Sequence, residues 1–191
     1  MPLYSLHLDA LAHAALEKAL RPGMHAVDAT AGNGYDTLFL ARRVGAKGRV
    51  WAFDVQRAAL EATRARLAGV EDAAPATLIH AGHEGLHQHI PEDSPINAAM
   101  FNLGYLPGSD KSITTNPEHV VAALRGLLRR AAPGAVFSVH AYTGHTRGDE
   151  ELRALLDLTE TLPYTEWNVL HTTTRNKALR PEHLFLLQRR I

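Results

Sequence analysis

The sequence predicts an α/β fold with a seven-stranded, mostly parallel sheet, helices on both faces and an antiparallel closing strand. First, residues 25–54 read as a strand, a glycine turn, a helix and a second strand. Second, short apolar runs alternate with amphipathic helical patterns along the rest of the chain, as in parallel sheets connected by helices. Third, several apolar runs end in a polar side chain and a loop. Strands of open α/β sheets end this way at the carboxyl edge, where ligands bind.

The composition is that of one globular domain spanning residues 1–191. Apolar residues make up 46% of the chain and charged residues 21%, which is usual for soluble proteins. Cysteine is absent, so disulfides and thiolate chemistry are excluded and a cytoplasmic location is favoured. The N-terminus has no basic leader, and no run approaches the roughly 18 apolar residues of a membrane span. We therefore expect no membrane partner.

The charge balance limits the possible partners. The 20 basic and 20 acidic residues cancel, which argues against extensive non-specific binding of nucleic acid. Basic clusters at 125–130 and 175–180 could still form local binding surfaces, although solvated charges on helices and loops explain the same residues. A homodimer would join two such modest surfaces.

Each element has a local signal. Residues 5–20 place apolar side chains on one helical face and stop at Arg21-Pro22-Gly23, so we expect a helix within residues 1–22 that packs on the core. Further helices are expected at 35–44, 55–67, 117–130 and 149–162, and strands at 26–28, 50–54, 76–80, 95–101 and 135–142. Closing strands at 165–170 and 184–188 are expected to pair in antiparallel fashion, with the polar segment 171–181 overhanging the site.

The turn between the first strand and its helix is the first candidate site. Gly32 and Gly34 allow a tight turn and close approach of a ligand, and the following helix offers free N–H groups. Asp54 ends the second strand 20 residues after Gly34, where a carboxylate can accept from both hydroxyls of a ribose. An ordinary strand, turn and helix without a ligand is the alternative.

The same turn favours one cofactor over another. A dinucleotide site needs a third glycine, and Thr37 stands at that position. Asp28 at the end of the first strand would repel a pyrophosphate but would suit a cationic sulfonium. This arrangement resembles motif I and its acidic partner in class I S-adenosylmethionine (SAM) methyltransferases.

The segment 83–87 matches the zinc motif H-E-x-x-H, with His83, Glu84 and His87. A helical site would direct both imidazoles at one metal, with Glu84 as a base. The segment is short, contains Gly85 and directly follows a strand, and no third ligand is marked downstream. We therefore expect no metal site. In a methyltransferase fold this turn would lie beside the adenine, so that His83 or Glu84 contacts the base edge.

The loop after the fourth strand is the second candidate site. Asn102 ends a buried strand and is followed by Leu103, Gly104, Tyr105 and Pro107. The loop resembles a relaxed N-P-P-Y loop of amino-group methyltransferases, in which an amide carbonyl and a backbone carbonyl accept the hydrogens of an amine. Tyr105 would stack on a base or flank the sulfonium. The alternative is a tight turn with Asn102 as a helix cap.

The end of the fifth strand adds three candidates for substrate contact or proton acceptance: His140, Tyr142 and His145. A histidine in a loop is also a common surface residue, so both interpretations stay open.

Four motifs carry a resemblance to one family along essentially the whole chain. They are D-A-T-A-G-N-G-Y-D-T-L-F-L-A at 28–41, F-D-V-Q at 53–56, N-L-G-Y-L-P-G-S-D-K-S-I-T-T at 102–115 and Y-T-G-H at 142–145. The chain resembles the small bacterial class I methyltransferases labelled rRNA methylases, which are associated with the tRNA wobble position. The resemblance implies a Rossmann-like fold and N-methylation of the aminomethyl group of 5-aminomethyl-2-thiouridine in tRNA.

The resemblance also implies roles for individual residues. It assigns SAM binding to Asp28, Ala31, Gly32, Asn33, Gly34, Asp54, Gln56 and His83. It places the reacting amine near Asn102, Leu103, Gly104 and Tyr105, with Asp110, Lys111 and His145 around the substrate mouth. We also expect Tyr142 to bind the substrate, and His145 is the general base to test. The C-terminal loop departs from the family pattern, with Asn176, a single Pro181 and several basic residues.

Other functions remain open at this level. Within methyltransferases the substrate could instead be rRNA or a small-molecule amine. A nicotinamide-dependent oxidoreductase is disfavoured by Thr37 and Asp28. A non-catalytic RNA-binding module would keep the fold but bind SAM poorly, and the zero net charge makes it the weakest alternative.

Overall fold

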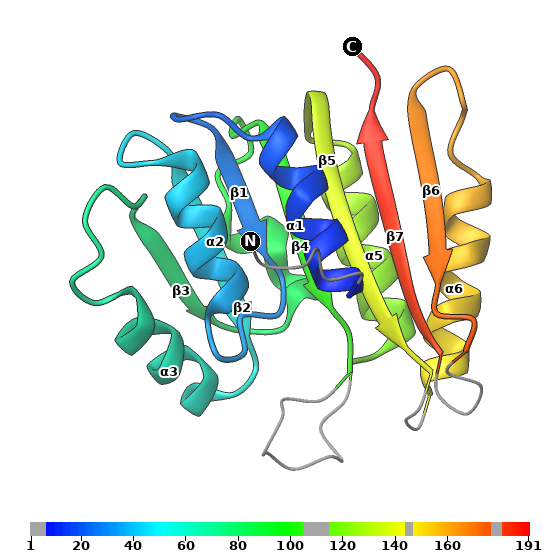
Figure 1. Cartoon of the computed structure of the whole chain (residues 1–191), viewed down its shortest axis with the longest axis horizontal. Helices are drawn as coiled ribbons and strands as arrows, with labels where there is room; N and C mark the ends of the chain where they lie inside the picture. Colours follow the sequence, from blue (N-terminus) through cyan, green and yellow to red (C-terminus); the bar gives the residue numbers. More distant parts are fainter. Residues whose placement is uncertain (1–6, 105–114, 144–146, 177–180) are drawn as a thin grey trace.

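A mixed sheet of seven strands, in the order β3-β2-β1-β4-β5-β7-β6, organises the molecule (Figure 1). The computed structural model describes residues 7–104, 115–143, 147–176 and 181–191. Strand β7 runs antiparallel to both neighbours, and the pairs among β1 to β5 are parallel. The strands are β1 (His25–Asp28), β2 (Arg49–Asp54), β3 (Ala76–His80), β4 (Ile96–Asn102), β5 (Ala131–Tyr142), β6 (Trp167–Thr173) and β7 (Glu182–Arg189). The predicted α/β class, strand number and antiparallel closure are confirmed.

Helices cover both faces of this sheet, as predicted (Figure 1). One face carries α1 (Leu8–Ala19), α2 (Tyr35–Val44) and α3 (Arg57–Leu67). The other carries η1 (His83–Gly85), α4 (Leu86–His89), α5 (Pro117–Leu128) and α6 (Gly148–Glu160). Among the described residues, none of the helices has the length and apolarity needed to cross a bilayer.

The core follows from strand periodicity. In β1, Ala26 belongs to the core cluster that includes side chains of α1 and α2, and Val27 belongs to the cluster that includes side chains of α5 and α6. Successive side chains of a strand point to opposite faces, so a run of small and branched apolar residues fills both layers at once. This explains why the central strands read as continuous apolar runs in the sequence.

Strands β5 and β6 begin or end at residues other than those predicted. Strand β5 starts at Ala131 and includes Pro133 and Gly134, four residues before the predicted start at 135, and its pairing with β4 is irregular between Ile96 and Ala98. Strand β6 runs to Thr173, although 171–173 were predicted to be loop. The polar residues fit there because β6 is an edge strand whose central side chains are largely exposed.

The topology brings one polar residue after another to the same edge. Asp28 pairs with Ala52 of β2 and Met100 of β4, and Asn102 pairs with His140 of β5. The carboxyl ends of these parallel strands therefore meet along the lower edge in Figure 1. That edge is where ligands of open α/β sheets bind.

Candidate functional site

A cavity of about 830 Å³ opens at this carboxyl edge. Strands β1 to β4 contribute to it through the loops that follow them, and β5 contributes its last residue, Tyr142. Residues of α1 and of the start of α5 close its sides. The residues predicted from the sequence that line it are Ala31, Gly32, Asn33, Asp54, Gln56, His83, Asn102, Leu103, Gly104 and Tyr142. One cavity thus unites the glycine turn with the Asn102 turn, although 70 positions separate Gly32 from Asn102.

Seven predicted residues are not among those that line the cavity. Asp28, Gly34 and His140 lie outside the cavity lining. Tyr105, Asp110, Lys111 and His145 lie outside the described residues, so their assigned roles stay predictions.

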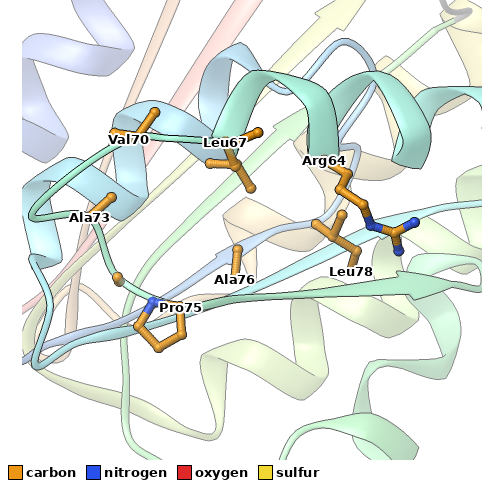
Figure 2. A pocket seen from close by; sticks show the side chains of 9 residues that line it. Arg64, Leu67, Val70, Ala73, Pro75, Ala76 and Leu78 are labelled. Carbon is orange, nitrogen blue, oxygen red and sulfur yellow. The ribbon is translucent and has the colours of Figure 1, made fainter.

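A smaller hollow elsewhere in the described structure has a different character (Figure 2). It measures about 410 Å³ and lies between the end of α3, the following loop and the start of β3. Its lining is apolar side chains such as Leu67, Pro75 and Leu78 around the single cation of Arg64. Its lining contains none of the predicted site residues.

The glycine turn is held by Asp54. The backbone N–H of Gly32 donates to Asp54 Oδ2 at 2.9 Å, and that of Gln56 donates to Oδ1 at 2.8 Å. Each carboxylate oxygen has a further lone pair, so Asp54 can hold the turn and still accept from the hydroxyls of a ribose. Thr63 of α3 donates its hydroxyl to the carbonyl of Gly32 at 3.1 Å and ties α3 to the same turn.

Gly34 serves packing as well as conformation. It adopts φ of 78° as the residue that precedes α2, a left-handed conformation that favours glycine. A Cβ here would lie 2.7 Å from the Cα of Thr63. The close approach predicted for a ligand is therefore, at Gly34, an approach of one backbone to another. Gly32, by contrast, lines the cavity.

Asp28 is fully buried behind the cavity wall. It accepts from the hydroxyl of Thr37 at 2.5 Å and from the backbone N–H of Thr30 at 3.1 Å. Burial, followed by the nearby charge of Asp36, raises the pKa of Asp28 to about 7. Asp28 does not line the cavity, and its assigned role in binding SAM stays a prediction. Asp28 supports the turn from behind, and Thr37 is its hydrogen-bond donor.

His83 lines the cavity from η1 and is almost fully buried. Its ring lies edge-on to Phe101, with centroids 5.7 Å apart. Burial lowers its pKa to about 4, so the imidazole is neutral at physiological pH. Its Nε2 has no hydrogen-bond partner within the described residues.

The zinc motif does not form one metal site in the described structure. A short 3-10 turn precedes the four-residue helix α4 here, and His83 is buried whereas His87 is exposed. Glu84 faces His119 of α5, with Oε2 3.4 Å from Nδ1. Among the described residues, no group of three His, Cys, Asp or Glu side chains is arranged to hold a metal.

The end of β5 adds a hydrogen-bonded group beside α1. His140 Nδ1 lies 2.7 Å from Asp9 Oδ1 and 3.2 Å from the hydroxyl of Tyr142. Burial and the nearby carboxylates raise the pKa of Tyr142 above its usual value, so its phenol stays protonated. Tyr142 lines the cavity, whereas the buried His140 does not. Of the two, Tyr142 is the residue that can reach a substrate directly.

Sequence patterns did not point to several cavity residues. Asp9 and His13 come from α1, Asp36 from the first turn of α2, and Thr115, Asn116 and His119 from the start of α5. The one available signal was the spacing of Asp9 and His13, which are four residues apart and therefore share a helix face. Asp36 reads as an ordinary acidic residue of a first helical turn.

Known proteins resemble this chain over nearly its full length. The family described as "Putative rRNA methylase" matches residues 50–188. The chloroplastic tRNA (mnm(5)s(2)U34)-methyltransferase of Arabidopsis thaliana is 33% identical over 187 residues, covering 94% of this chain and 68% of that protein.

Solved structures agree with these matches. An rRNA methylase structure from Clostridium thermocellum superposes with a TM-score of 0.90 at 34% identity, covering 98% of this chain and 100% of that one. A methyltransferase structure from Streptococcus mutans, solved in complex with SAH, gives 0.84 at 31% identity, covering 97% and 99%.

These sequence and structural similarities are consistent with the fold and with a cavity that unites the glycine turn at Gly32, the strand end at Asp54 and the turn at 102–104. The chain belongs to this rRNA methylase family and is a SAM-dependent methyltransferase.

Proposed function

We propose that this enzyme N-methylates the aminomethyl group of 5-aminomethyl-2-thiouridine at the wobble position of tRNA. The observation that carries the proposal is the placement of the Asn102 turn in the same cavity as the glycine turn and Asp54. The Arabidopsis relative supports the choice of substrate, because its name gives a modified U34 of tRNA.

The cavity residues fit SAM. Asp54 at the end of β2 suits the ribose, and the neutral ring of His83, which lines the cavity after β3, suits the adenine. When bound, SAM supplies an electrophilic methyl group on a sulfonium, which becomes a neutral thioether once the methyl has moved to the acceptor nitrogen.

The protein must bring a neutral amine to this methyl. A free alkylamine is largely protonated at neutral pH, since the lysine reference pKa is about 10.4. Amide and carbonyl acceptors at Asn102 and Leu103 would hold the N–H hydrogens of the neutral amine and direct its lone pair at the methyl. Methyl transfer to the neutral amine leaves a protonated methylamine, which can lose its extra proton to water.

The cavity rim offers a surface for an unpaired base. Tyr35 is 64% exposed at the rim, and the guanidinium of Arg66 lies 3.5 Å from the centroid of its ring. Arg66 Nε also donates to the carbonyl of Asn33 at 2.6 Å. Unpaired RNA bases stack on aromatic rings and guanidinium planes. A wobble base in the anticodon loop is unpaired in free tRNA and need not be flipped from a duplex.

The decisive experiment is methyl transfer from labelled SAM to tRNA that carries 5-aminomethyl-2-thiouridine, followed by nucleoside analysis. We expect the methylaminomethyl nucleoside with the wild-type enzyme and its loss with Asn102→Ala. Transfer to rRNA or to small amines, with none to this tRNA, would refute the wobble assignment and leave the methyltransferase itself intact.

A further inference from the structure

A chain of three side chains links α1 and α2 to the end of β4. His13 Nε2 lies 2.6 Å from Asp36 Oδ1, and Asn102 Nδ2 donates to Asp36 Oδ2 at 2.5 Å. The three residues all line the cavity. Asp36 therefore uses one carboxylate oxygen for each neighbour.

This contact fixes the direction of the Asn102 amide. An ionised carboxylate can only accept hydrogen bonds, whereas the two ends of an amide differ, with NH₂ donating and oxygen accepting. The nitrogen of Asn102 must therefore face Asp36, which leaves Oδ1 as its acceptor for a ligand. The backbone N–H of Asn102 also donates to Thr30 Oγ1 at 2.7 Å, so the residue is held at both its main chain and its side chain.

The carboxylate itself is well supported. The Asp36 side chain is 14% exposed and that of His13 is 33% exposed, so water competes little for the shared contact. The His13 ring stacks on Phe39, with centroids 4.1 Å apart and planes 5° from parallel. Asp36 also lies in the first turn of α2, where the helix dipole favours a negative charge.

We propose that Asp36, supported by His13, is a positioning residue that orients the Asn102 amide so that its oxygen accepts from the amine to be methylated. This inference rests on the proposed amine substrate. Asp36 acts through Asn102, and its effect belongs to the orientation of the acceptor amine and not to binding of SAM.

One test is independent of activity. In ¹⁵N-resolved NMR spectra, the side-chain NH₂ signals of Asn102 are identified by their loss in Asn102→Ala. We expect one of these protons to be strongly downfield in the wild type and to return toward ordinary amide positions in Asp36→Ala. Signals at ordinary positions in the wild type would refute the contact, whatever the substrate is.

The second test is a double-mutant cycle on methyl transfer. We expect Asp36→Ala to lower kcat about 100-fold, the scale of a misplaced reactant, with SAM affinity within twofold of wild type. Asn102→Ala with Asp36→Ala should be no slower than Asn102→Ala alone, because the two residues act as one unit. Multiplying effects, or weakened SAM binding, would overturn the proposal.

Two further variants complete the design. In Asp36→Asn the new amide oxygen can still accept from Asn102, so this variant should keep at least ten times the activity of Asp36→Ala. Equal loss in both would assign the effect to charge and refute positioning. Glu17→Ala is the matched control, because Glu17 of α1 pairs with Arg43 of α2 at half-exposed positions and joins the same helices without touching Asn102. If wild type transfers no methyl to the tRNA, the proposed function fails while the NMR test still decides the contact.

Discussion

Substituting Gly34 separates backbone strain from crowding at the cofactor turn. Both Gly34 and Gly69 have positive φ, at 78° and 72°. A Cβ at Gly34 meets the Cα of Thr63 at 2.7 Å, whereas a Cβ at Gly69 meets nothing within 4 Å. Gly69→Ala therefore measures the conformational cost alone, and Gly34→Ala measures that cost together with the displacement of α3.

The expected magnitudes follow from these contacts. Left-handed backbone costs an alanine about 1–2 kcal/mol, partly offset by about 0.4–1 kcal/mol from the stiffer unfolded chain. Overpacking adds about 1–3 kcal/mol at Gly34, since the clashing atom is backbone and cannot rotate away. We expect a loss of about 1 kcal/mol in the free energy of unfolding for Gly69→Ala and about 2–4 kcal/mol for Gly34→Ala.

Denaturant unfolding followed by the fluorescence of the buried Trp51 and Trp167 measures both losses. Calorimetric titration with SAM adds the functional consequence. Affinity should fall in Gly34→Ala, because displacement of Thr63 moves the carbonyl of Gly32, and should be unchanged in Gly69→Ala. Equal destabilisation of the two variants would refute the crowding argument.

Three further predictions concern the buried or turn-forming groups. The pKa of Asp28 is raised from 3.8 to about 7, so the native state holds a proton that the unfolded state releases, and stability declines as pH rises from about 4 to 7. Asp28→Asn removes this titration, so above pH 7 its free energy of unfolding should exceed that of wild type by up to about 4 kcal/mol. A difference in urea midpoints that does not change with pH would contradict this prediction. The pKa of His83 is lowered from 6.5 to about 4, so protons bind the unfolded state preferentially and stability declines as pH falls from about 6.5 to 4. His83→Gln should reduce this decline in the same urea titrations. An unchanged dependence on pH would count against a buried neutral imidazole. Asp54→Ala leaves two backbone N–H groups without their acceptor and should weaken SAM binding at least tenfold in calorimetry; retained affinity would exclude Asp54 from the cofactor site.

Local signals in the sequence were sufficient to predict most helices and strands and to place the candidate site at the carboxyl edge of the sheet. Gly32, Asp54 and Asn102 could be placed at one site because each ends or follows an apolar run, and parallel strands present their carboxyl ends together. Predictions failed where local composition misleads. The polar end of β6 reads as a loop because an edge strand exposes its side chains, and the start of β5 is obscured by Pro133 and Gly134.

By itself, then, the sequence determined the fold class, the order of its elements and the cavity wall made by strand ends, since these depend on periodicity and turn chemistry within short windows. Only the tertiary structure decided which distant residues contact one another. Asp36 meets Asn102 across 66 positions and His13 across 23, and Gly34 owes its constraint to Thr63 on another helix. No periodicity encodes such contacts, because a hydrogen bond between distant segments depends on how helices and strands pack, which only the assembled core defines.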